Sequence, residues 1–268
     1  MKKIRLDQLV FDRGMTESRE RARTSIMAGL VTVNGRKADK PGMAVPEDAE
    51  VELRGDSIPY VSRGGLKLEK ALRVFRVTPE GHTCLDCGAS TGGFTDVMLR
   101  NGAGKVYAVD VGYGQLAWKI RNDPRVVCLE RTNIRYITKK EIPESIDFAA
   151  ADLSFISLRL ILGAVYELLA PSADMVCLVK PQFEAGKEKV GKKGVVRDAS
   201  VHREVLEDFI DYSNRIGYGL RGLDYSPIRG PEGNIEYLAW IRKGSGSIDP
   251  PDLSALVEAS HAAAGKEE

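Results

Sequence analysis

Short apolar runs alternate with amphipathic stretches from about residue 63 onward. Runs of strand length occupy Thr83–Cys87, Gly104–Val109, Arg125–Leu129, Ile146–Ala151 and Met175–Val179. Helical spacing of apolar residues follows Arg63, covers Phe94–Leu99 and begins again after Gly112. The segment Leu153–Leu158 leads into a further helix that ends at about Leu169, and the last of these helices spans Val201–Ile216. Two late runs, Gly219–Tyr225 and Ile235–Ile241, predict a hairpin-like pair of strands. Strands that alternate with helices predict an α/β fold with a doubly wound, mostly parallel sheet.

The first part of the chain has a different pattern. Leu6–Val10 has the spacing of a short helix, and a second helix, capped by Thr16 or Ser18, continues to Ala28. Two short apolar runs then flank Asn34-Gly35, a dipeptide typical of hairpin turns, and Val51–Leu53 supplies a closing strand. This pattern predicts a small α+β domain over residues 1–58. A linker at 59–62 precedes the α/β domain at 63–243, and the tail at 244–268 includes a final helix.

The chain is almost neutral, so a surface for nucleic acid would have to be local. Lys and Arg number 39 against 38 Asp and Glu. The basic surplus lies in residues 1–67 and 181–203, whereas the tail is acidic. No apolar run approaches the ~20 residues that span a bilayer, and the first residues lack a signal-peptide core, so we expect a cytoplasmic protein.

The cysteines and histidines do not suggest a metal or redox site. Cys84 and Cys87 have Cys-x-x-Cys spacing, but a second close pair is missing and Cys84 lies inside a strand. Buried thiols are the favoured interpretation of this pair, and Cys128 and Cys177 stand alone in apolar runs. The three histidines are scattered along the chain, so we expect no metal.

A glycine-rich turn links the strand at Thr83–Cys87 to the next helix and is the candidate cofactor site. Its glycines let the backbone approach a ligand, and the helix supplies free N–H groups. The turn lacks the second glycine of the dinucleotide fingerprint, and Asp86 suits a ligand that bears an amine. Asp110, at the tip of the next strand, can accept hydrogen bonds from a ribose. S-adenosylmethionine fits these features. The expected cofactor residues are Asp86, Gly88, Ala89, Ser90, Thr91, Gly92, Gly93, Phe94, Asp110, Asn133 at the adenine edge, and Asp152.

Four ionisable residues are the candidate catalytic group: Lys67, Asp152, Lys180 and Glu236. Lys180 ends an apolar strand, where a lysine is costly unless it is paired or neutral. Asp152 ends the preceding strand and can pair with it if the two strands are neighbours. Lys67 opposes the dipole of its own helix, which is a mild sign of function. For any two of these residues, a structural ion pair at a sheet edge is the favoured interpretation. For all four together it is not.

The front domain resembles the S4 RNA-binding domain. The resemblance rests on the run from Ser18 through Gly35, with Arg19 and Arg23 one helical turn apart, and it covers about residues 4–55. It implies contact between this helix and the phosphates of structured RNA. A solvated helix is the alternative for this face. For residues 184–197 we expect a mobile loop that closes over RNA, and a plain solvated loop is the alternative. The expected RNA-binding residues are Arg5, Arg19, Arg23, Arg36, Lys37, Arg63, Lys187, Lys189, Lys192 and Lys193.

The order Lys67, Asp152, Lys180, Glu236 resembles the catalytic tetrad of FtsJ-like ribose 2′-O-methyltransferases. Together with the S4-like front, the chain looks like a member of the TlyA-type family of haemolysins and ribosomal RNA methyltransferases. The matching segments are 63–67, 86–96, 110–112, 152–157 and 179–184. The resemblance implies a Rossmann-like sheet with one antiparallel strand, S-adenosylmethionine as cofactor, and a cytidine ribose in 16S or 23S ribosomal RNA as substrate. It also implies that Lys180 takes or orients the hydroxyl proton.

Three other functions are alternatives to an RNA methyltransferase. A non-catalytic RNA-binding or ribosome assembly factor would bind the cofactor without transferring its methyl group, but the intact set of four residues argues against it. A membrane-active haemolysin would need a segment for the bilayer, which the sequence does not display. A small-molecule methyltransferase would leave the RNA-binding front domain without a role.

Overall fold

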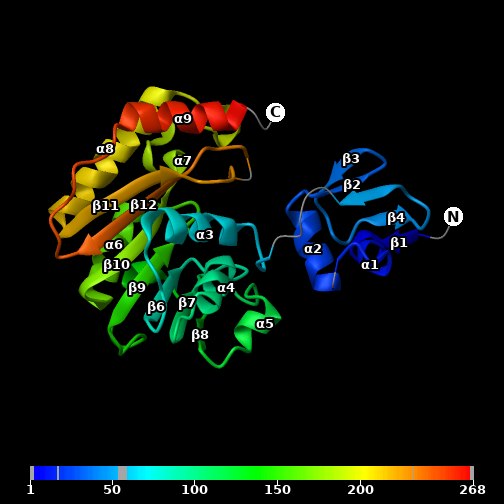
Figure 1. The fold of residues 1–268 in the computed structure, drawn as a ribbon, viewed down its shortest axis with the longest axis horizontal. Helices are drawn as coiled ribbons and strands as arrows, with labels where there is room; N and C mark the ends of the chain where they lie inside the picture. Colours follow the sequence, from blue (N-terminus) through cyan, green and yellow to red (C-terminus); the bar gives the residue numbers. More distant parts are fainter. Residues whose placement is uncertain (1–2, 17, 54–58, 231, 266–268) are drawn as a thin grey trace. The chain divides into compact units, whose positions relative to one another are not determined.

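The computed structural model describes residues 3–16, 18–53, 59–230 and 232–265 (Figure 1). The chain forms two compact units, one up to Gly65 and one from Leu66 onward.

The first unit is a small α+β fold around a core that includes Leu6, Ile26 and Val31. Its elements are β1 (Lys3–Arg5), α1 (Leu6–Asp12), α2 (Arg19–Met27), β2 (Val31–Val33), β3 (Arg36–Ala38), β4 (Ala44–Pro46) and β5 (Val51–Leu53). Strand β2 pairs antiparallel with β3 and β5, and β1 pairs with β4. Ser18 caps α2 by accepting a hydrogen bond from the backbone of Arg21, as the sequence predicts.

The predicted hairpin of the first unit is confirmed, whereas two of its strands were not predicted. Asn34 and Gly35 both have positive φ, at 50° and 72°, which matches the preferred two-residue hairpin turn. Strands β1 and β4 are three residues long and, unlike β2 and β3, they do not flank an Asn-Gly turn that would mark them in the sequence.

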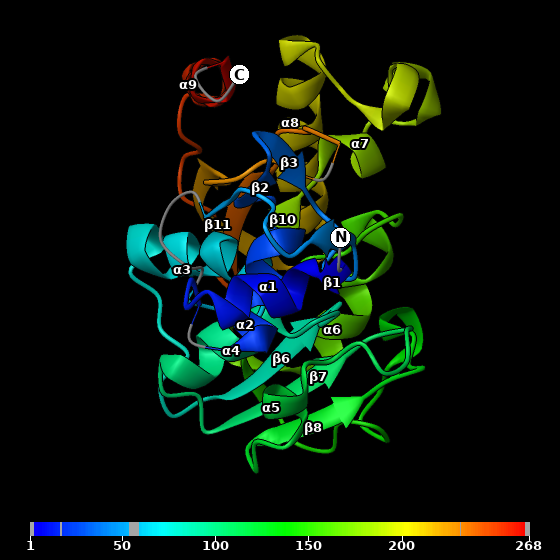
Figure 2. The same ribbon diagram turned by 90° about the vertical axis from the view of Figure 1, so that its right-hand side faces the viewer.

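The second unit contains a seven-stranded sheet in the order β11-β12-β10-β9-β6-β7-β8. Its strands are β6 (Thr83–Cys87), β7 (Lys105–Val109), β8 (Val126–Leu129), β9 (Ile146–Ala151), β10 (Leu169–Val179), β11 (Tyr218–Tyr225) and β12 (Tyr237–Lys243). Strand β12 is antiparallel to both neighbours, and the other described pairs are parallel. The predicted sheet, mostly parallel with one antiparallel strand, is confirmed. Figure 2 shows β6, β7 and β8 side by side at one end of this sheet.

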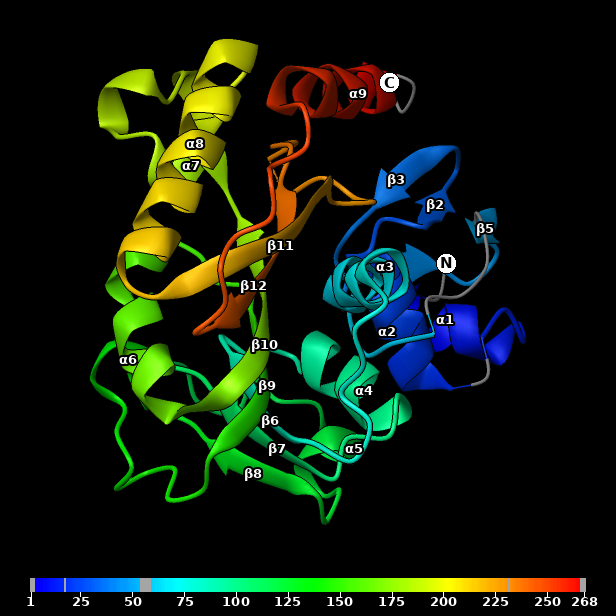
Figure 3. The same cartoon turned by 60° about the vertical axis from the view of Figure 1, so that its left-hand side comes forward.

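Helices cover both faces of the sheet. They are α3 (Gly64–Phe75), α4 (Gly93–Arg100), α5 (Trp118–Arg121), α6 (Leu162–Leu168), α7 (Pro181–Glu184), α8 (Ala199–Arg215) and α9 (Leu253–Gly265). Figure 3 shows α3, α4 and α5 on one side of the sheet and α6 and α8 on the other. Helix α9 packs against α8 and β11. No helix among the described residues has the length and apolar character needed to cross a bilayer.

Two predicted helices are shorter in the structure. The helix predicted to follow the segment Leu153–Leu158 and to end at about Leu169 is α6. It begins only at Leu162, because Ser157 caps a separate 3-10 turn, Leu158–Leu160. The chain then enters β10 at Leu169, so that strand starts six residues earlier than predicted. The helix predicted after Gly112 is reduced to the four residues of α5.

Candidate active site

The register of the sheet brings the candidate residues to one edge. Cys87 of β6 pairs with Val109 of β7 and with Ala151 of β9, and Ala151 also pairs with Cys177 of β10. The carboxyl ends of four parallel strands are therefore nearly level, and the residues that follow them lie along this edge. On the antiparallel strand, Tyr237 pairs with Val179. Glu236 just before β12 therefore lies next to Lys180 just after β10.

Side chains from four elements form one ionic cluster at this edge. The Nζ atom of Lys180 lies 2.6 Å from Oδ1 of Asp152, and Nζ of Lys67 lies 3.3 Å from its Oδ2. Lys67 also lies 2.7 Å from Oε2 of Glu236. The two strands that end at Asp152 and Lys180 are neighbours, as this pairing requires. The carboxylate of Asp152 thus bridges the two lysines, and Lys67 bridges the two carboxylates.

The cluster favours the charged forms of Lys67 and Asp152 despite their burial. Burial opposes the charge on Lys67, but the carboxylates of Asp152 and Glu236 outweigh it and raise the pKa of Lys67 above its ordinary value. Burial likewise opposes the charge on Asp152, but the two lysines hold its pKa below the usual range. The side chain of Asp152 is still 19% exposed, so the cluster opens to solvent at this residue. A substrate can therefore reach it there.

Helix α3 is held in place by a second lysine one turn after Lys67. The Nζ atom of Lys70 donates to the carbonyl of Tyr225 at 2.6 Å and lies 3.1 Å from Oδ1 of Asp224. It also lies 3.9 Å from the centre of the Tyr225 ring. These contacts join α3 to the end of β11, and Lys67 is thereby fixed against the two carboxylates.

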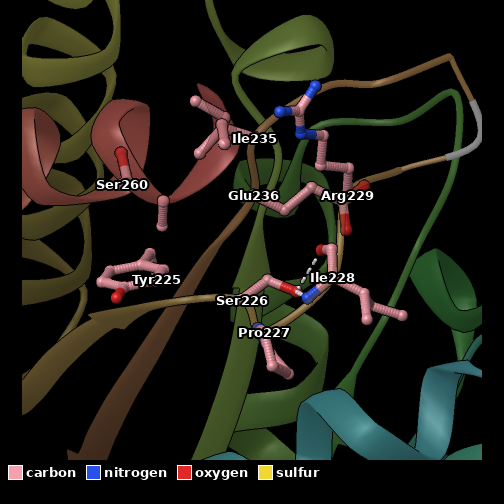
Figure 4. Close-up of a pocket in the computed structure, with 10 residues that line it drawn as sticks. Tyr225, Ser226, Pro227, Ile228, Arg229, Ile235, Glu236 and Ser260 are labelled. Atoms are coloured by element: carbon pink, nitrogen blue, oxygen red, sulfur yellow. Dashed lines mark hydrogen bonds between the residues drawn. The ribbon is translucent and has the colours of Figure 1, made fainter. Parts of the chain in front are cut away.

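The segment between β11 and β12 encloses Glu236. The backbone N–H of Ser226 donates to the carbonyl of Glu236 at 2.8 Å, and a Cβ atom at Gly230 would lie 2.8 Å from its Oε1. Figure 4 shows Glu236 beside Ser226, Ile228 and Arg229, with a residue of α9, Ser260, across the same small pocket. This packing fixes the orientation of the Glu236 carboxylate.

The glycine-rich turn and Asp110 form the candidate cofactor site. Gly88 has φ +87°, and a Cβ atom there would lie 2.8 Å from the carbonyl oxygen of Asp152, so glycine is required. The carboxylate of Asp110 accepts the backbone N–H groups of Ser90 at 2.8 Å and Gly112 at 2.7 Å. Asp110 therefore holds the first loop against the second. Each of its oxygens has a further lone pair that a ribose hydroxyl can use.

Asp86 has an unused acceptor directly beneath this turn. It is fully buried, and its Oδ2 accepts the backbone N–H of Thr95 at 2.9 Å and its hydroxyl at 2.6 Å, whereas Oδ1 has no partner. Burial raises the pKa of Asp86 to about 7, although the hydrogen bonds from Thr95 lower it. A buried acceptor without a partner is rare and calls for a donor. The amino group of S-adenosylmethionine fits this chemistry.

Other expected cofactor residues differ in their exposure. The ring of Phe94 is buried in the protein, and the carbonyl of Thr91 accepts the backbone N–H of Ala117. Asn133 is exposed and caps a 3-10 turn by accepting the N–H of Arg135. Ala89 and Gly93 are buried, and Gly92 begins α4 with φ +96°.

Phe155 is a feature of the site that the sequence analysis did not single out. It is 92% exposed and has φ +65°, an uncommon conformation for a bulky residue. Its ring centre lies 5.3 Å from that of Phe183, and both line a cavity of about 650 Å³ together with Arg135 and Lys187. The available signal was an aromatic residue three positions after the strand-end Asp152.

Two of the expected RNA-binding arginines meet at one buried acid. Arg5 donates to both oxygens of Asp7 at 3.0 and 2.9 Å, and Arg19 lies 3.3 Å from Oδ2 of the same carboxylate. About half of each arginine side chain remains exposed. Arg23, Arg36 and Lys37 are exposed on the same unit, and Arg63 is half-buried.

The basic loop at 184–197 has more contacts with the rest of its unit than a plain solvated loop would have. Lys189 forms an ion pair with Glu204 of α8, and Asn234 binds the carbonyl of Gly194 and the N–H of Val196. Lys187 and Lys193 are exposed, and the side chain of Lys192 lies outside the described part of the chain.

The four cysteines form no disulfide; three of them are buried and Cys128 is half-buried, and burial opposes their ionisation. Burial raises the pKa of Cys84 to about 12 and raises the pKa of Cys87, Cys128 and Cys177 as well. A thiolate nucleophile is therefore not available among them. Within the described residues, no group of three or more potential ligands could hold a metal ion.

We predict that Asp86→Asn stabilises the ligand-free protein at high pH. A free aspartate ionises near pH 4, so ionisation of a group with a folded pKa of about 7 removes stability as the pH rises between these values. The asparagine of the variant cannot ionise, so the variant does not lose this stability. Its advantage in unfolding free energy over the wild type should therefore widen by ~2 to 3 kcal/mol between pH 5 and pH 8 in urea titrations. An advantage that does not change with pH would contradict the assignment.

The sequence matches the FtsJ-like methyltransferase family over residues 60–243 and the S4 domain over residues 4–51. It is 51% identical over 266 residues to "Putative rRNA methyltransferase YqxC" of Bacillus subtilis, covering 97% of this chain and 95% of that protein. It is 46% identical over 242 residues to "16S/23S rRNA (cytidine-2'-O)-methyltransferase TlyA" of Mycobacterium tuberculosis, with 90% of each chain covered.

A solved structure, "Putative hemolysin from Streptococcus thermophilus", superposes with a TM-score of 0.81 and 47% identity, covering 100% of this chain and 98% of that one. The resemblance inferred from the sequence motifs is therefore confirmed over nearly the whole length. The chain belongs to the TlyA-type family, in which an FtsJ-like methyltransferase domain follows an S4 domain.

Proposed function

We propose that this protein transfers a methyl group from S-adenosylmethionine to the ribose 2′-hydroxyl of a cytidine in 16S or 23S ribosomal RNA. The observation that carries the proposal is the cluster of Lys67, Asp152, Lys180 and Glu236 beside the glycine-rich turn. The name of the M. tuberculosis relative supports this nucleoside and this position. We further propose residues 1–58 as the RNA-binding domain, 59–62 as a linker, 63–243 as the catalytic domain and 244–268 as a tail.

S-adenosylmethionine supplies a methyl group on a positively charged sulfur, which a deprotonated or strongly oriented hydroxyl can attack. Asp86 would hold its amino group with the unused Oδ1, and Asp110 would hold its ribose. The turn from Gly88 to Gly93, Asn133 and Asp152 would complete the site. The carbonyl of Asp152 lies against Gly88, so the cofactor turn adjoins the ionic cluster.

Lys180 is the residue we assign to the hydroxyl proton. A ribose hydroxyl is a very weak acid and needs a base or a strong hydrogen-bond partner at the moment of transfer. Lys67 has two carboxylates within 3.3 Å, whereas Lys180 has one carboxylate, which it shares with Lys67. Lys180 is therefore the less compensated ammonium group, and we assign it the role of base. Its own proton would leave to solvent first, and its Nζ would then take the proton of the hydroxyl as the methyl group is transferred.

Lys67 and Glu236 hold the charge of the site while the proton moves. Lys67 keeps its charge, so Asp152 stays ionised and continues to orient Lys180 when Lys180 is neutral. Glu236 balances Lys67 and, together with it, would hold the substrate hydroxyl. Much of the rate should come from fixing the hydroxyl and the methyl group in line.

The RNA would be bound by basic groups of both units and by an aromatic surface at the site. Arg5 and Arg19 present guanidinium groups whose position is fixed by Asp7, which suits contact with phosphates. Arg23, Arg36, Lys37, Arg63 and the loop lysines at 187, 189, 192 and 193 would extend this contact. The exposed ring of Phe155 is a surface on which a nucleobase can stack close to Lys180.

We predict that Lys180→Met abolishes methyl transfer without loss of cofactor binding. Methionine has a similar length but cannot exchange a proton, so transfer of labelled methyl groups to 30S and 50S subunits that lack the modification should fall at least ~10²-fold. Lys140→Met, which replaces an exposed lysine, is the control and should match the wild type.

The outcomes of assays with the wild-type protein distinguish the three alternative functions. Wild-type protein that binds S-adenosylmethionine but methylates neither subunit would favour an RNA-binding or assembly factor. Leakage of liposomes caused by the purified protein would instead favour a membrane-active haemolysin. Transfer to small molecules but not to subunits would favour a small-molecule methyltransferase.

We predict that Phe155→Leu lowers kcat/KM for the RNA substrate, whereas Phe155→Tyr does not. Leucine keeps apolar bulk but lacks the flat ring, and one base-stacking contact is worth ~1 to 3 kcal/mol, so the loss should be about 5- to 150-fold. The affinity for S-adenosylmethionine alone should stay the same in both variants. Equal activity of the two variants would show that the ring does not bind a base.

A further inference from the structure

Glu184, at the end of the short helix α7, connects the two loops that carry Asp152 and Lys180. Its Oε2 accepts the hydroxyl of Ser157 at 2.6 Å, and its Oε1 accepts the backbone N–H of Leu158 at 2.8 Å. Ser157 and Leu158 lie five and six residues after Asp152, and Glu184 lies four residues after Lys180. One carboxylate therefore joins the segment that follows β9 to the segment that follows β10.

The same two segments touch at three other places, all nearer to the reacting groups. Lys180 contacts Asp152 at 2.6 Å and donates to Oγ of Ser154 at 3.3 Å. The rings of Phe155 and Phe183 meet at 5.3 Å. The Glu184 bonds form the outer end of this series of contacts, and the Lys180–Asp152 pair forms its inner end.

The segment from Leu153 to Ser157 needs such an anchor because nothing regular holds it. It contains neither helix nor strand, and Phe155 within it has φ +65°. A bulky residue in this conformation persists only when its surroundings hold it there. Two hydrogen bonds to a carboxylate are strong enough to supply that hold, since charged acceptors make the stronger hydrogen bonds.

Burying the carboxylate of Glu184 costs free energy, and capping the turn that follows Ser157 does not require it. Burial raises the pKa of Glu184, although the bonds from Ser157 and Leu158 lower it. Ser157 already caps the turn that follows, by accepting the N–H of Arg159 at 3.2 Å. The turn is thus capped without Glu184, and the connection to α7 is what the carboxylate adds.

We propose that Glu184 is a positioning residue that sets the separation of Asp152 and Lys180 by tying the segment after β9 to α7. This inference rests on the proposed methyl transfer, in which Asp152 orients Lys180. It assigns Glu184 no contact with substrate or cofactor.

The test compares Glu184→Ala with Glu184→Gln. Alanine removes both bonds, whereas the glutamine amide can accept from Leu158 with its oxygen and donate to Ser157 with its nitrogen. We expect Glu184→Ala to lower kcat ~10²-fold, as a displacement of about 1 Å can do. The Gln variant should stay within ~3-fold of the wild type. The dissociation constant for S-adenosylmethionine should change less than ~2-fold in both, because the bonds lie outside the cofactor turn. Glu167→Ala, at an exposed position of α6, is the matched control.

Two further measurements distinguish a positioning role of Glu184 from a folding defect of the variant and from a failure of the proposed function. Ser157→Ala removes one of the two bonds and should give a smaller loss of kcat than Glu184→Ala. A crystal structure of Glu184→Ala should show the Lys180–Asp152 contact lengthened, whatever the activity. A contact that stays at 2.6 Å, or a Gln variant as impaired as the Ala variant, would overturn the inference. An inactive wild type would count against the proposed function alone.

Discussion

The carboxylate of Asp152, shared between two lysines, is the interaction on which the site depends. Charges removed from water are costly unless they are paired, and here two positive and two negative groups lie within 3.3 Å of a partner. The pairing explains why the end of a buried sheet can contain lysines at all. It also leaves Lys180 with a single, shared carboxylate next to a glycine-rich turn, and the proposed proton transfer rests on this asymmetry.

The remainder of the α/β unit holds this cluster in place. The register of β6, β9 and β10 levels their ends, and antiparallel β12 brings Glu236 beside Lys180. Lys70 fixes α3 and therefore Lys67. The cofactor turn is joined to the next loop through Asp110, so both halves of the proposed reaction are positioned by short hydrogen bonds between strand ends. The arrangement of the strand ends thus positions most of the residues on which the proposed catalysis depends.

The sequence predicted the sheet and the cluster because both follow from local patterns. Buried strands appear as apolar runs, and a lysine such as Lys180 at the end of one is visible without a structure. The sequence could not show that Phe155 adopts a left-handed conformation or that Glu184 reaches back to Ser157, because these depend on contacts between loops. The late start of α6, at Leu162, has the same origin, since Ser157 and Glu184 hold the first residues of a 3-10 turn, Leu158–Leu160, that precedes it.

The position of the methyl group in the product tests the central claim most directly. Unmodified ribosomal subunits would be incubated with the protein and S-adenosylmethionine, and the RNA digested to nucleosides for mass spectrometry. A lysine-centred cluster without an available thiolate predicts 2′-O-methylcytidine. A methyl group on the cytosine ring or on its amino group would contradict the account, because the cluster would then not act on a ribose hydroxyl.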